Sequence, residues 1–256
     1  MKDVIDISEM KVDQSTQKPV LTGLAKRIGD VDRRAVEAAL QLREKHGGKV
    51  TLLSLGDEKT PTALKEALAM GADDAYVLRD ASFEGSDTLA TSRILAAGIR
   101  KIGGFDAIFC GETTLDSLSA QVGPRVAQIL GLPQLEYVKK IELVDGKLRA
   151  QRDLGEDEMV EVSPPAVVIV TREVNEPRIP SLMNIIKASR KTTIEWDSSA
   201  LGLGRDLVGV QGSGVMLLDV RVPPMERKKI IIKAETPEEA VEMLIDRLQK
   251  DGVLRR

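Results

Sequence analysis

The sequence predicts an α/β protein, with a mostly parallel open sheet and flanking helices, followed by an extended C-terminal arm and a final helix. From residue 30 onward, stretches with helical periodicity alternate with short β-branched runs, as in parallel sheets covered by helices. From Thr192 to Pro224 the chain is rich in Gly and Ser and only weakly periodic, which predicts the arm. We therefore expect an α/β domain over residues 1–190 and a C-terminal region over residues 191–256.

The predicted helices begin at capping residues or prolines, and Gly residues end most of them. They span about residues 30–46, 60–70, 88–102, 121–130 and 236–249, with Asp30 or Asp32 as the expected cap of the first. The expected strands of the main sheet are residues 49–55, 75–78, 106–110 and 166–171. Antiparallel strands are expected at 137–143, 147–153 and 158–161, around an Asp145-Gly146 turn.

Composition excludes several classes of function. The 256 residues carry a formal net charge of −3, with mixed signs and no basic block, so nucleic acid is not an expected partner. The longest nearly uncharged apolar run, Pro164 to Thr171, is far shorter than the roughly 20 residues that span a bilayer. We expect no membrane span and a cytoplasmic location.

The sequence offers few residues that could bind a metal ion or form a catalytic triad. Cys110 is the only cysteine and His46 the only histidine, too few for a zinc site of the usual N and S ligands. His46 lies in a charged helix end just before Gly47-Gly48, where we interpret it as a solvated helix terminus. We expect no metal site.

Ligands of open parallel sheets bind at the carboxyl ends of the strands, so the loops after Leu55, Leu78, Cys110 and Thr171 are candidates. The loop from Cys110 to Pro124 has a Gly at the strand end and then small hydroxylic residues that open a helix. Backbone N–H groups and hydroxyls at a helix start suit a phosphate or pyrophosphate. An ordinary Ser/Thr-capped turn is the alternative.

Asp87, with Thr88, Thr91 and Ser92, forms a second helix opening of this kind, for which simple capping is the favoured interpretation. Neither opening contains a G-x-G-x-x-G or G-x-x-x-x-G-K-[ST] motif, and residues 201–204 (LGLG) lack the third Gly and a preceding strand. A third stretch, Thr171 to Ala188, places apolar residues in a loop after two prolines, namely Leu182, Met183, Ile185 and Ile186. They form either a small core or a docking surface.

Together these residues resemble the beta subunit of electron transfer flavoprotein, in the long form of electron-bifurcating complexes. The resemblance covers about Lys2 to Leu254 and is most specific at Val170 to Lys187, around Asn-Glu-Pro-Arg. Cys110 to Pro124 is similar to the family's adenine-nucleotide loop, C-G-x-Q-A-x-D-x-D-T-x-Q-V-G-P. Thr113, Thr114 and Leu118 stand where Gln, Ala and Asp are usual, and Gly29-Asp30 replaces Asn-Pro of an earlier segment.

The resemblance implies an adenine-nucleotide-hydrolase-like fold and a heterodimer with an alpha subunit, whose FAD transfers electrons. This chain would then have no catalytic acid, base or nucleophile, and it would hold a cofactor and dock a dehydrogenase or quinone oxidoreductase through Leu182 and Lys187. The implied cofactor-binding residues are Gly29, Asp32, Leu55, Asp87, Thr88, Thr91, Cys110, Gly111, Asp116, Ser119, Gln121, Val122 and Gly123.

Two further stretches favour FAD over AMP as the cofactor of this subunit. Residues 86–92 (SDTLATS) resemble the helix opening of bifurcating members, and residues 208–213 (VGVQGS) resemble their V-G-L-K-G-S tail. Such a site would take electrons from NADH or a dehydrogenase. A non-bifurcating beta subunit with a structural AMP is the alternative.

Two functions outside this family remain open from the sequence. Gly85-Ser86-Asp87 faintly resembles the S-G-G-x-D-S loop of ATP-pyrophosphatase-type adenine-nucleotide hydrolases, but it follows a later strand and lacks the second Gly. A universal-stress-type nucleotide-binding module would explain the sheet but not Val170 to Lys187.

The N-terminus departs from the family pattern. Members open with an apolar strand of about seven residues, whereas this sequence begins at the following turn, with Met1 to Asp6. Without that strand its neighbours would keep unpaired N–H and C=O groups, each costing on the order of 1–3 kcal/mol if buried. We expect the natural chain to start upstream, or another segment to fill the slot.

Overall fold

The computed structural model describes residues 1–5, 10–223 and 229–254. Its contacts define two units, of which the first comprises Met1–Lys11 and Pro19–Val220 and the second comprises Val12–Lys18 and Arg221–Arg256. The candidate site lies in the first unit, which contains both larger sheets.

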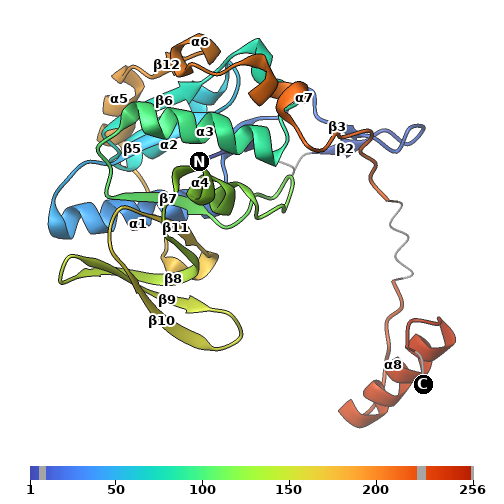
Figure 1. Ribbon diagram of the computed structural model, residues 1–256. Coiled ribbons are helices and arrows are strands. Elements are labelled where there is room, and N and C mark those ends of the chain that lie inside the picture. The colour runs from blue at the N-terminus through green and yellow to red at the C-terminus, as the bar shows by residue number, and fades with distance from the viewer. Residues whose placement is uncertain (6–9, 224–228, 255–256) are drawn as a thin grey trace. The chain divides into compact units, whose positions relative to one another are not determined.

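Both larger sheets of the first unit contain parallel strands, so the expected α/β class with a mostly parallel open sheet is confirmed (Figure 1). The three-stranded sheet is all parallel, in the order β12-β6-β5, with β5 at Thr51–Leu55, β6 at Asp74–Leu78 and β12 at Ile194–Trp196. The five-stranded sheet has the order β10-β9-β8-β11-β7. Its parallel strands are β7 (Ala107–Gly111), β11 (Ala166–Val170) and β8 (Gln134–Val144). Its antiparallel strands are β9 (Lys147–Asp153) and β10 (Asp157–Val162).

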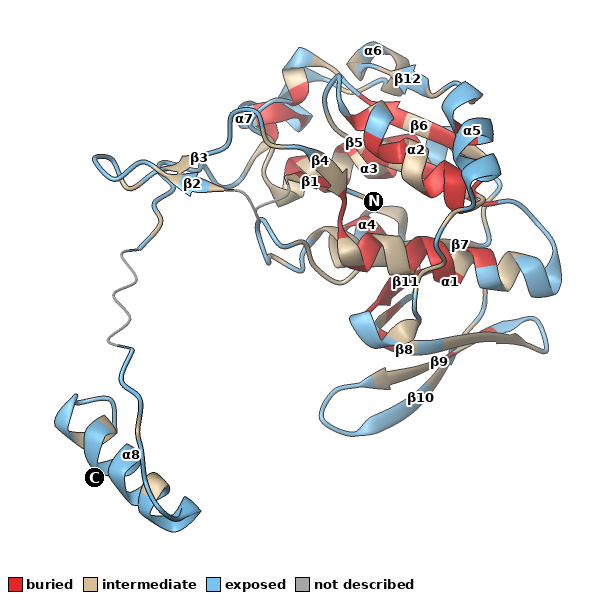
Figure 2. Ribbon diagram, turned by 180° about the vertical axis from the view of Figure 1, so that it is seen from behind, coloured by how far each residue is buried: buried red, intermediate tan, exposed pale blue. Residues whose placement is uncertain are grey.

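Helices cover both faces of the parallel strands β5, β6, β7 and β11, whereas β9 and β10 extend away from them (Figures 1 and 2). On one face lie α3 (Thr88–Ile102) and α4 (Val122–Leu130); on the other lie α1 (Asp30–His46), α2 (Thr60–Met70) and α5 (Leu182–Arg190). The core follows from the sequence, because every residue of β11, Ala-Val-Val-Ile-Val, is buried. A strand covered on both faces reads as a continuous run of β-branched residues rather than as an alternation.

Short elements complete the two units. They are β1 (Asp3–Ile5), β2 (Lys11–Val12), β3 (Pro19–Val20), β4 (Lys26–Ile28), η2 (Ala81–Phe83), η3 (Arg172–Val174), α6 (Ser198–Leu201), η4 (Arg205–Leu207) and α7 (Gly209–Gly212). β1 pairs antiparallel with β4. Among the described residues, β5 and β7 are each the last strand of their sheet, and the amino group of Met1 donates a hydrogen bond to the Leu53 carbonyl on β5 (3.0 Å).

Three local expectations are wrong. The apolar residues after the two prolines form a helix, α5, because Leu182, Ile185 and Ile186 recur at helical spacing and Ser181 caps the helix by accepting from the Asn184 N–H (3.2 Å). The cap of α1 is Gly29, with no side-chain cap hydrogen bond, so neither Asp30 nor Asp32 has that role.

The arm is the third difference. It is not uniformly extended, since β12 joins the three-stranded sheet and Val208 is buried in a cluster with Leu78 and Ile94. The compact unit continues to Val220, and the predicted last arm residue, Pro224, lies outside the described residues.

The second unit contains α8 (Pro237–Lys250). Thr236 caps it by accepting a hydrogen bond from the Glu239 N–H (3.2 Å), as the Thr-Pro-Glu-Glu sequence predicts. None of its described residues is buried, and Val241, Leu244 and Ile245 are all more than 40% exposed. Among the described residues, no helix combines the length and the apolar character needed to cross a bilayer.

Candidate functional site

The start of α3 is organised by the carboxylate of Asp87. One carboxylate oxygen accepts hydrogen bonds from the N–H groups of Leu89 (2.8 Å) and Ala90 (2.9 Å), which is ordinary N-terminal capping. The other accepts from Gly214 (2.8 Å) and Val215 (3.0 Å), at the start of the exposed tail of the first unit. Burial opposes the charged form, but these four backbone donors outweigh it and hold the pKa of Asp87 below its usual value.

Hydroxyl groups extend this contact between α3 and residues 209–215. The Asp87 N–H donates to Ser213 Oγ (2.8 Å), and Ser213 Oγ donates to the carbonyl of Gly209 (2.7 Å). The Gly209 N–H in turn donates to Ser86 Oγ (2.9 Å). The residues that resemble the family's V-G-L-K-G-S tail therefore lie directly on the start of α3.

The start of α4 differs, because no side chain caps it. Gln121, the residue before the helix, accepts hydrogen bonds through Oε1 from Thr88 Oγ1 (2.7 Å) and Arg125 Nη2 (3.1 Å). The Thr88 bond connects the two predicted helix openings, which the structure thus brings together. Among the described residues, no side chain accepts from the N–H groups of Val122 and Gly123, the first of α4, and these groups suit an anionic ligand.

The loop between β7 and α4 is irregular and partly exposed. Leu118 (φ 49°) and Ala120 (φ 52°) flank Ser119 in left-handed backbone conformations that are unusual for these residue types. Asp116 forms an ion pair with Lys2 and accepts from Thr114 Oγ1 (2.6 Å). Burial works against its charged form, but these bonds leave the pKa of Asp116 lowered.

One loop hydroxyl indicates a missing partner. Thr113 Oγ1 is buried and has no hydrogen-bond partner among the described residues. Buried hydroxyls are rarely left unsatisfied, because desolvation costs roughly 1–3 kcal/mol. Thr113 stands where the family has Gln, so the position keeps a hydrogen-bonding side chain in a shorter form.

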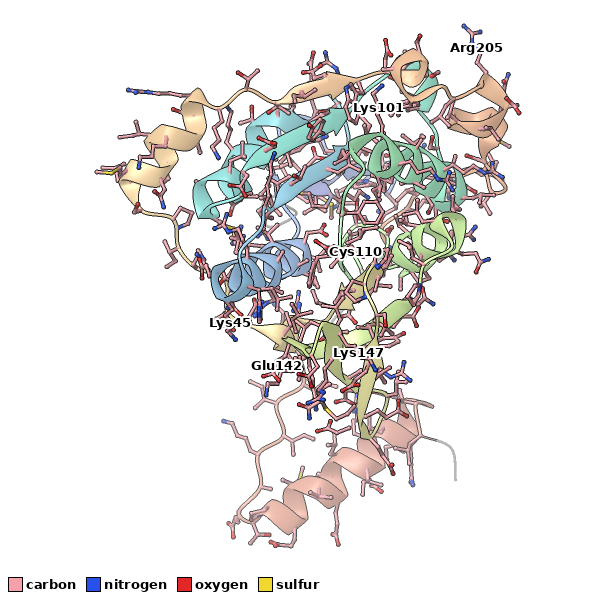
Figure 3. The ribbon with its side chains drawn as sticks, turned by 60° about the vertical axis from the view of Figure 1, so that its left-hand side comes forward. Lys45, Lys101, Cys110, Glu142, Lys147 and Arg205 are labelled. Carbon is pink, nitrogen blue, oxygen red and sulfur yellow. The ribbon has the colours of Figure 1, made fainter. Side chains whose placement is uncertain are left out.

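Close packing fixes the end of β7 beneath α4. A Cβ atom on Gly123 would lie 3.0 Å from Cys110 Sγ and 3.0 Å from Ile169 Cδ1. Figure 3 labels Cys110 inside the fold, and burial, with the nearby Asp32 carboxylate, raises the pKa of its thiol to about 12. The Cys110 thiol therefore packs beneath α4 in its protonated form, which is the unreactive form of a cysteine side chain.

The buried carboxylate of Asp32 holds two segments together. It accepts from the Gly111 N–H (3.3 Å) and the Lys2 N–H (2.8 Å). A Cβ on Gly29 would lie 3.4 Å from the same carboxylate, so Gly29, Asp32 and Gly111 are neighbours. The N–H of Gly111, one of the implied cofactor-binding residues, is thus already donated within the protein.

The other predicted residues take different places. Leu55 ends β5 and packs in the cluster that contains Leu78 and Ile94, while Thr91 and Val122 lie in the first turns of α3 and α4. No hydrogen bond joins Leu55 or the Thr91 side chain to the loop after Cys110 among the described residues.

The predicted docking residues lie on α5, which packs against α2 and not at the loop after β7. Leu182 is 74% exposed, whereas Ala188 is buried. Two lysines cap the helix ends reciprocally: Lys65 Nζ of α2 donates to the Ser189 carbonyl (3.0 Å), and Lys191 Nζ donates to the Ala72 carbonyl (2.7 Å). The exposed apolar side of α5 is therefore held on a fixed helix.

Sequence reasoning missed three contributors to the site. Lys2 pairs with Asp116, and the N–H groups of Gly214 and Val215 bind Asp87. The contact of the tail with α3 had a signal, because both stretches resemble the same family members. The Lys2 contact had none, since the two residues are far apart in sequence.

Comparisons with known proteins agree with the resemblance. A family model described as an electron transfer flavoprotein domain matches residues 20–201. The chain is 37% identical over 256 residues to an electron transfer flavoprotein subunit beta from Thermoanaerobacterium thermosaccharolyticum, covering 99% of this chain and 98% of that protein. It is 33% identical over 264 residues to the subunit of the same name from Megasphaera elsdenii, with 100% and 97% covered. A caffeyl-CoA reductase-Etf complex subunit, CarD, from Acetobacterium woodii is 32% identical over 255 residues, with 99% and 97% covered.

Proposed function

We propose that this chain, which belongs to the electron transfer flavoprotein family as a beta subunit, binds FAD. The proposed site is the place where the starts of α3 and α4 meet. The Thr88–Gln121 hydrogen bond carries this proposal, because it places two hydroxyl-rich helix openings side by side. AMP needs one phosphate site, whereas the pyrophosphate and ribityl chain of FAD need donors over a longer path.

The residues present fit such a group. The uncapped α4 start supplies backbone donors near Gln121, Val122 and Gly123, and the buried Thr113 hydroxyl lacks a partner among the described residues. Thr88 and Ser119 add hydroxyl groups, of which that of Thr88 also donates to Gln121. The acidic Asp116 is paired with Lys2, which limits its repulsion of a phosphate.

The bound flavin would supply electron transfer, and the chain would bind it, orient it and shield it. Electrons would pass from NADH or a dehydrogenase to an acceptor through the FAD of an alpha subunit. The described side chains around the two helix openings include no histidine, and the Cys110 thiol is protonated over the physiological pH range. This environment supports cofactor binding rather than acid–base or nucleophilic catalysis.

We further propose that α5 docks a dehydrogenase or quinone oxidoreductase. Leu182 and Met183 are 74% and 65% exposed, and Lys187 lies in the last turn of the same helix. An apolar face with a cationic end suits a partner surface that is apolar with an acidic rim. In an L182A variant we expect slower electron transfer from the dehydrogenase with unchanged flavin content. L154A, at an exposed leucine between β9 and β10, is the control.

The predicted C-terminal region, residues 191–256, would pack on the alpha subunit through its exposed part, although the compact unit that includes the nucleotide-binding domain at 1–190 continues to Val220. Val215, Met216, Leu217 and Leu218 are each more than 60% exposed, and such a contiguous apolar run indicates a protein interface. The lone free Cys110 is compatible with action in the reducing cytoplasm.

Cofactor stoichiometry tests the proposal. The chain is coexpressed with its alpha subunit, and the flavin and adenine nucleotide released from the purified heterodimer are quantified. Two FAD and no AMP per heterodimer are expected; one FAD with one AMP would contradict FAD binding here and identify the structural-AMP form. Incubation with ATP and Mg²⁺ is the parallel assay. Turnover of ATP would favour the alternative function, an adenine-nucleotide hydrolase of the ATP-pyrophosphatase type.

A further inference from the structure

Charged residues surround a cavity at the carboxyl end of β11, apart from the meeting point of α3 and α4. A cavity of about 450 Å³ opens there between the start of α1 and residues 172–180. This volume is within the range of small-molecule sites, roughly 300–1,000 Å³. Its cationic lining residues are Arg33, Arg34, Arg172 and Arg178, and its apolar ones are Pro177, Ile179 and Pro180.

The carboxylates of the cavity are already paired. Arg33 Nη2 lies 2.5 Å from Glu66 Oε1, and Arg34 Nη2 lies 3.1 Å from Glu176 Oε1. Asp30, the remaining acid, pairs with an arginine outside the cavity. Glu176 is 88% exposed, so its hold on Arg34 is open to competition from solvent and from other anions.

The arginines that line the cavity differ in whether they have partners among the described residues. Arg178 is occupied by Glu37 (2.8 Å) and Glu44 (2.5 Å). Arg172 acts on Glu112 through space but has no hydrogen bond or ion pair within the part of the chain that the structure describes. Nε of Arg33 is buried and also lacks a partner among those residues.

We infer that this cavity binds the phosphate group of a small molecule. Guanidinium groups bind phosphate oxygens with paired N–H donors, and the exposed guanidinium of Arg172 has no partner among the described residues. The positive end of the α1 dipole adds to the attraction at Arg33 and Arg34. The half-buried Pro177 and Pro180 form the wall on which an uncharged part of the ligand would pack.

Inorganic pyrophosphate is the probe, and its binding to the full-length chain is measured by calorimetry. In an R172Q variant we expect affinity to fall about tenfold, as for loss of a charge-assisted pair of hydrogen bonds. An R205Q variant is the matched control, since Arg205 is exposed and projects from the periphery of the fold in Figure 3. Its affinity should equal that of the wild type.

A second variant gives an effect of opposite sign. E176Q removes the acid that occupies Arg34, at a position too exposed to matter for folding, so pyrophosphate should bind several-fold more tightly. Equal affinity in wild type, R172Q and E176Q would overturn the inference, because pyrophosphate would then bind elsewhere, for example at the start of α4. Undetectable binding in all three, or binding of an acidic peptide in its place, would overturn it as well.

Discussion

The starts of α3 and α4 are similar in sequence but use their backbone donors differently. Asp87, in the extended conformation that capping requires (φ −73°, ψ −173°), caps α3. Gln121 has nearly helical angles (φ −103°, ψ −27°), and no side chain caps α4. Of two Ser/Thr-rich helix openings, only α4 therefore keeps its first donors available for a ligand.

This difference in capping gives the two helix starts different roles, one structural and one available for binding, although their sequences looked alike. At α3 the polar groups are used within the protein, to cap the helix and to hold Gly214 and Val215. At α4 no side chain caps the helix, and in the loop before it the buried hydroxyl of Thr113 has no partner among the described residues. For the proposed FAD site, the loop before α4 therefore offers the open donors, and Asp87 at the start of α3 would support it.

Replacing Asp87 by Ala should have the largest effect. It removes the acceptor of four backbone N–H groups, and we expect a loss of about 2–3 kcal/mol in the free energy of unfolding, combining a lost cap with lost charge-assisted bonds. Hydrogen exchange at residues 209–220 should rise with it. E84Q, at an exposed acid in the same loop, should change neither. Unchanged exchange in D87A would show that Asp87 does not hold the tail.

The same carboxylate should give an acid-sensitive contribution to stability. The pKa of Asp87 is lowered in the folded state, so its contribution is fully present above the unfolded value of about 3.9. It is lost as the pH falls through the lower, folded value. Urea unfolding measures the difference in the free energy of unfolding between wild type and D87N. This difference should be constant from pH 5 to 7 and should shrink below about pH 4. A difference that does not change with pH would mean that the charge of Asp87 does not stabilise the start of α3.

At α4, close packing replaces the cap, and Gly123 tests this. The Cβ of an Ala would meet Cys110 Sγ and Ile169 Cδ1 at 3.0 Å, so G123A should cost about 1–2 kcal/mol through overpacking. Q128A, at an exposed position on the same helix, should stay within about 0.5 kcal/mol of wild type. Thermal unfolding measures both. An unaffected G123A would show that α4 is free to move away from β7.

A charge at the start of α4 should separate stability from binding. Glu at position 121 could still accept the Thr88 hydrogen bond, and a negative charge there favours the helix dipole by about 0.5 kcal/mol. It would also repel a phosphate, so cofactor retention by Q121E should fall at least about tenfold. Q128E carries the same charge farther along the helix and should retain the cofactor. Full retention by Q121E would place the anion site elsewhere.

Much of the fold was predictable, because local rules and tertiary structure agree. The Asp145-Gly146 turn joins β8 to β9, and the β-branched run at 166–170 is the buried β11. Prediction failed where distant contacts decide. β12 has only three residues, and it forms a strand because it pairs with β6.

The site was predicted less completely for the same reason. The sequence identifies both helix openings, but Asp87 is saturated by Gly214 and Val215, and Asp32 by Lys2 and Gly111. Whether a polar residue is free or already paired depends on residues far away in the chain. Motif matching identifies polar groups near a site, and only the hydrogen bonds show which of them a ligand could still use.

The smallest effect concerns the link between the two starts, and a double-mutant cycle isolates it. T88V and Q121A each remove one partner of the 2.7 Å hydrogen bond, and their coupling should be about 0.5–1 kcal/mol in the free energy of unfolding. Thr91, one turn further on, makes no side-chain bond to Gln121, so the T91V/Q121A cycle should show no coupling and serves as the control. Equal coupling in both cycles would mean that Gln121 senses α3 through packing alone. The two starts would then be neighbours without a specific link, and an added FAD, rather than the protein, would have to hold them in register.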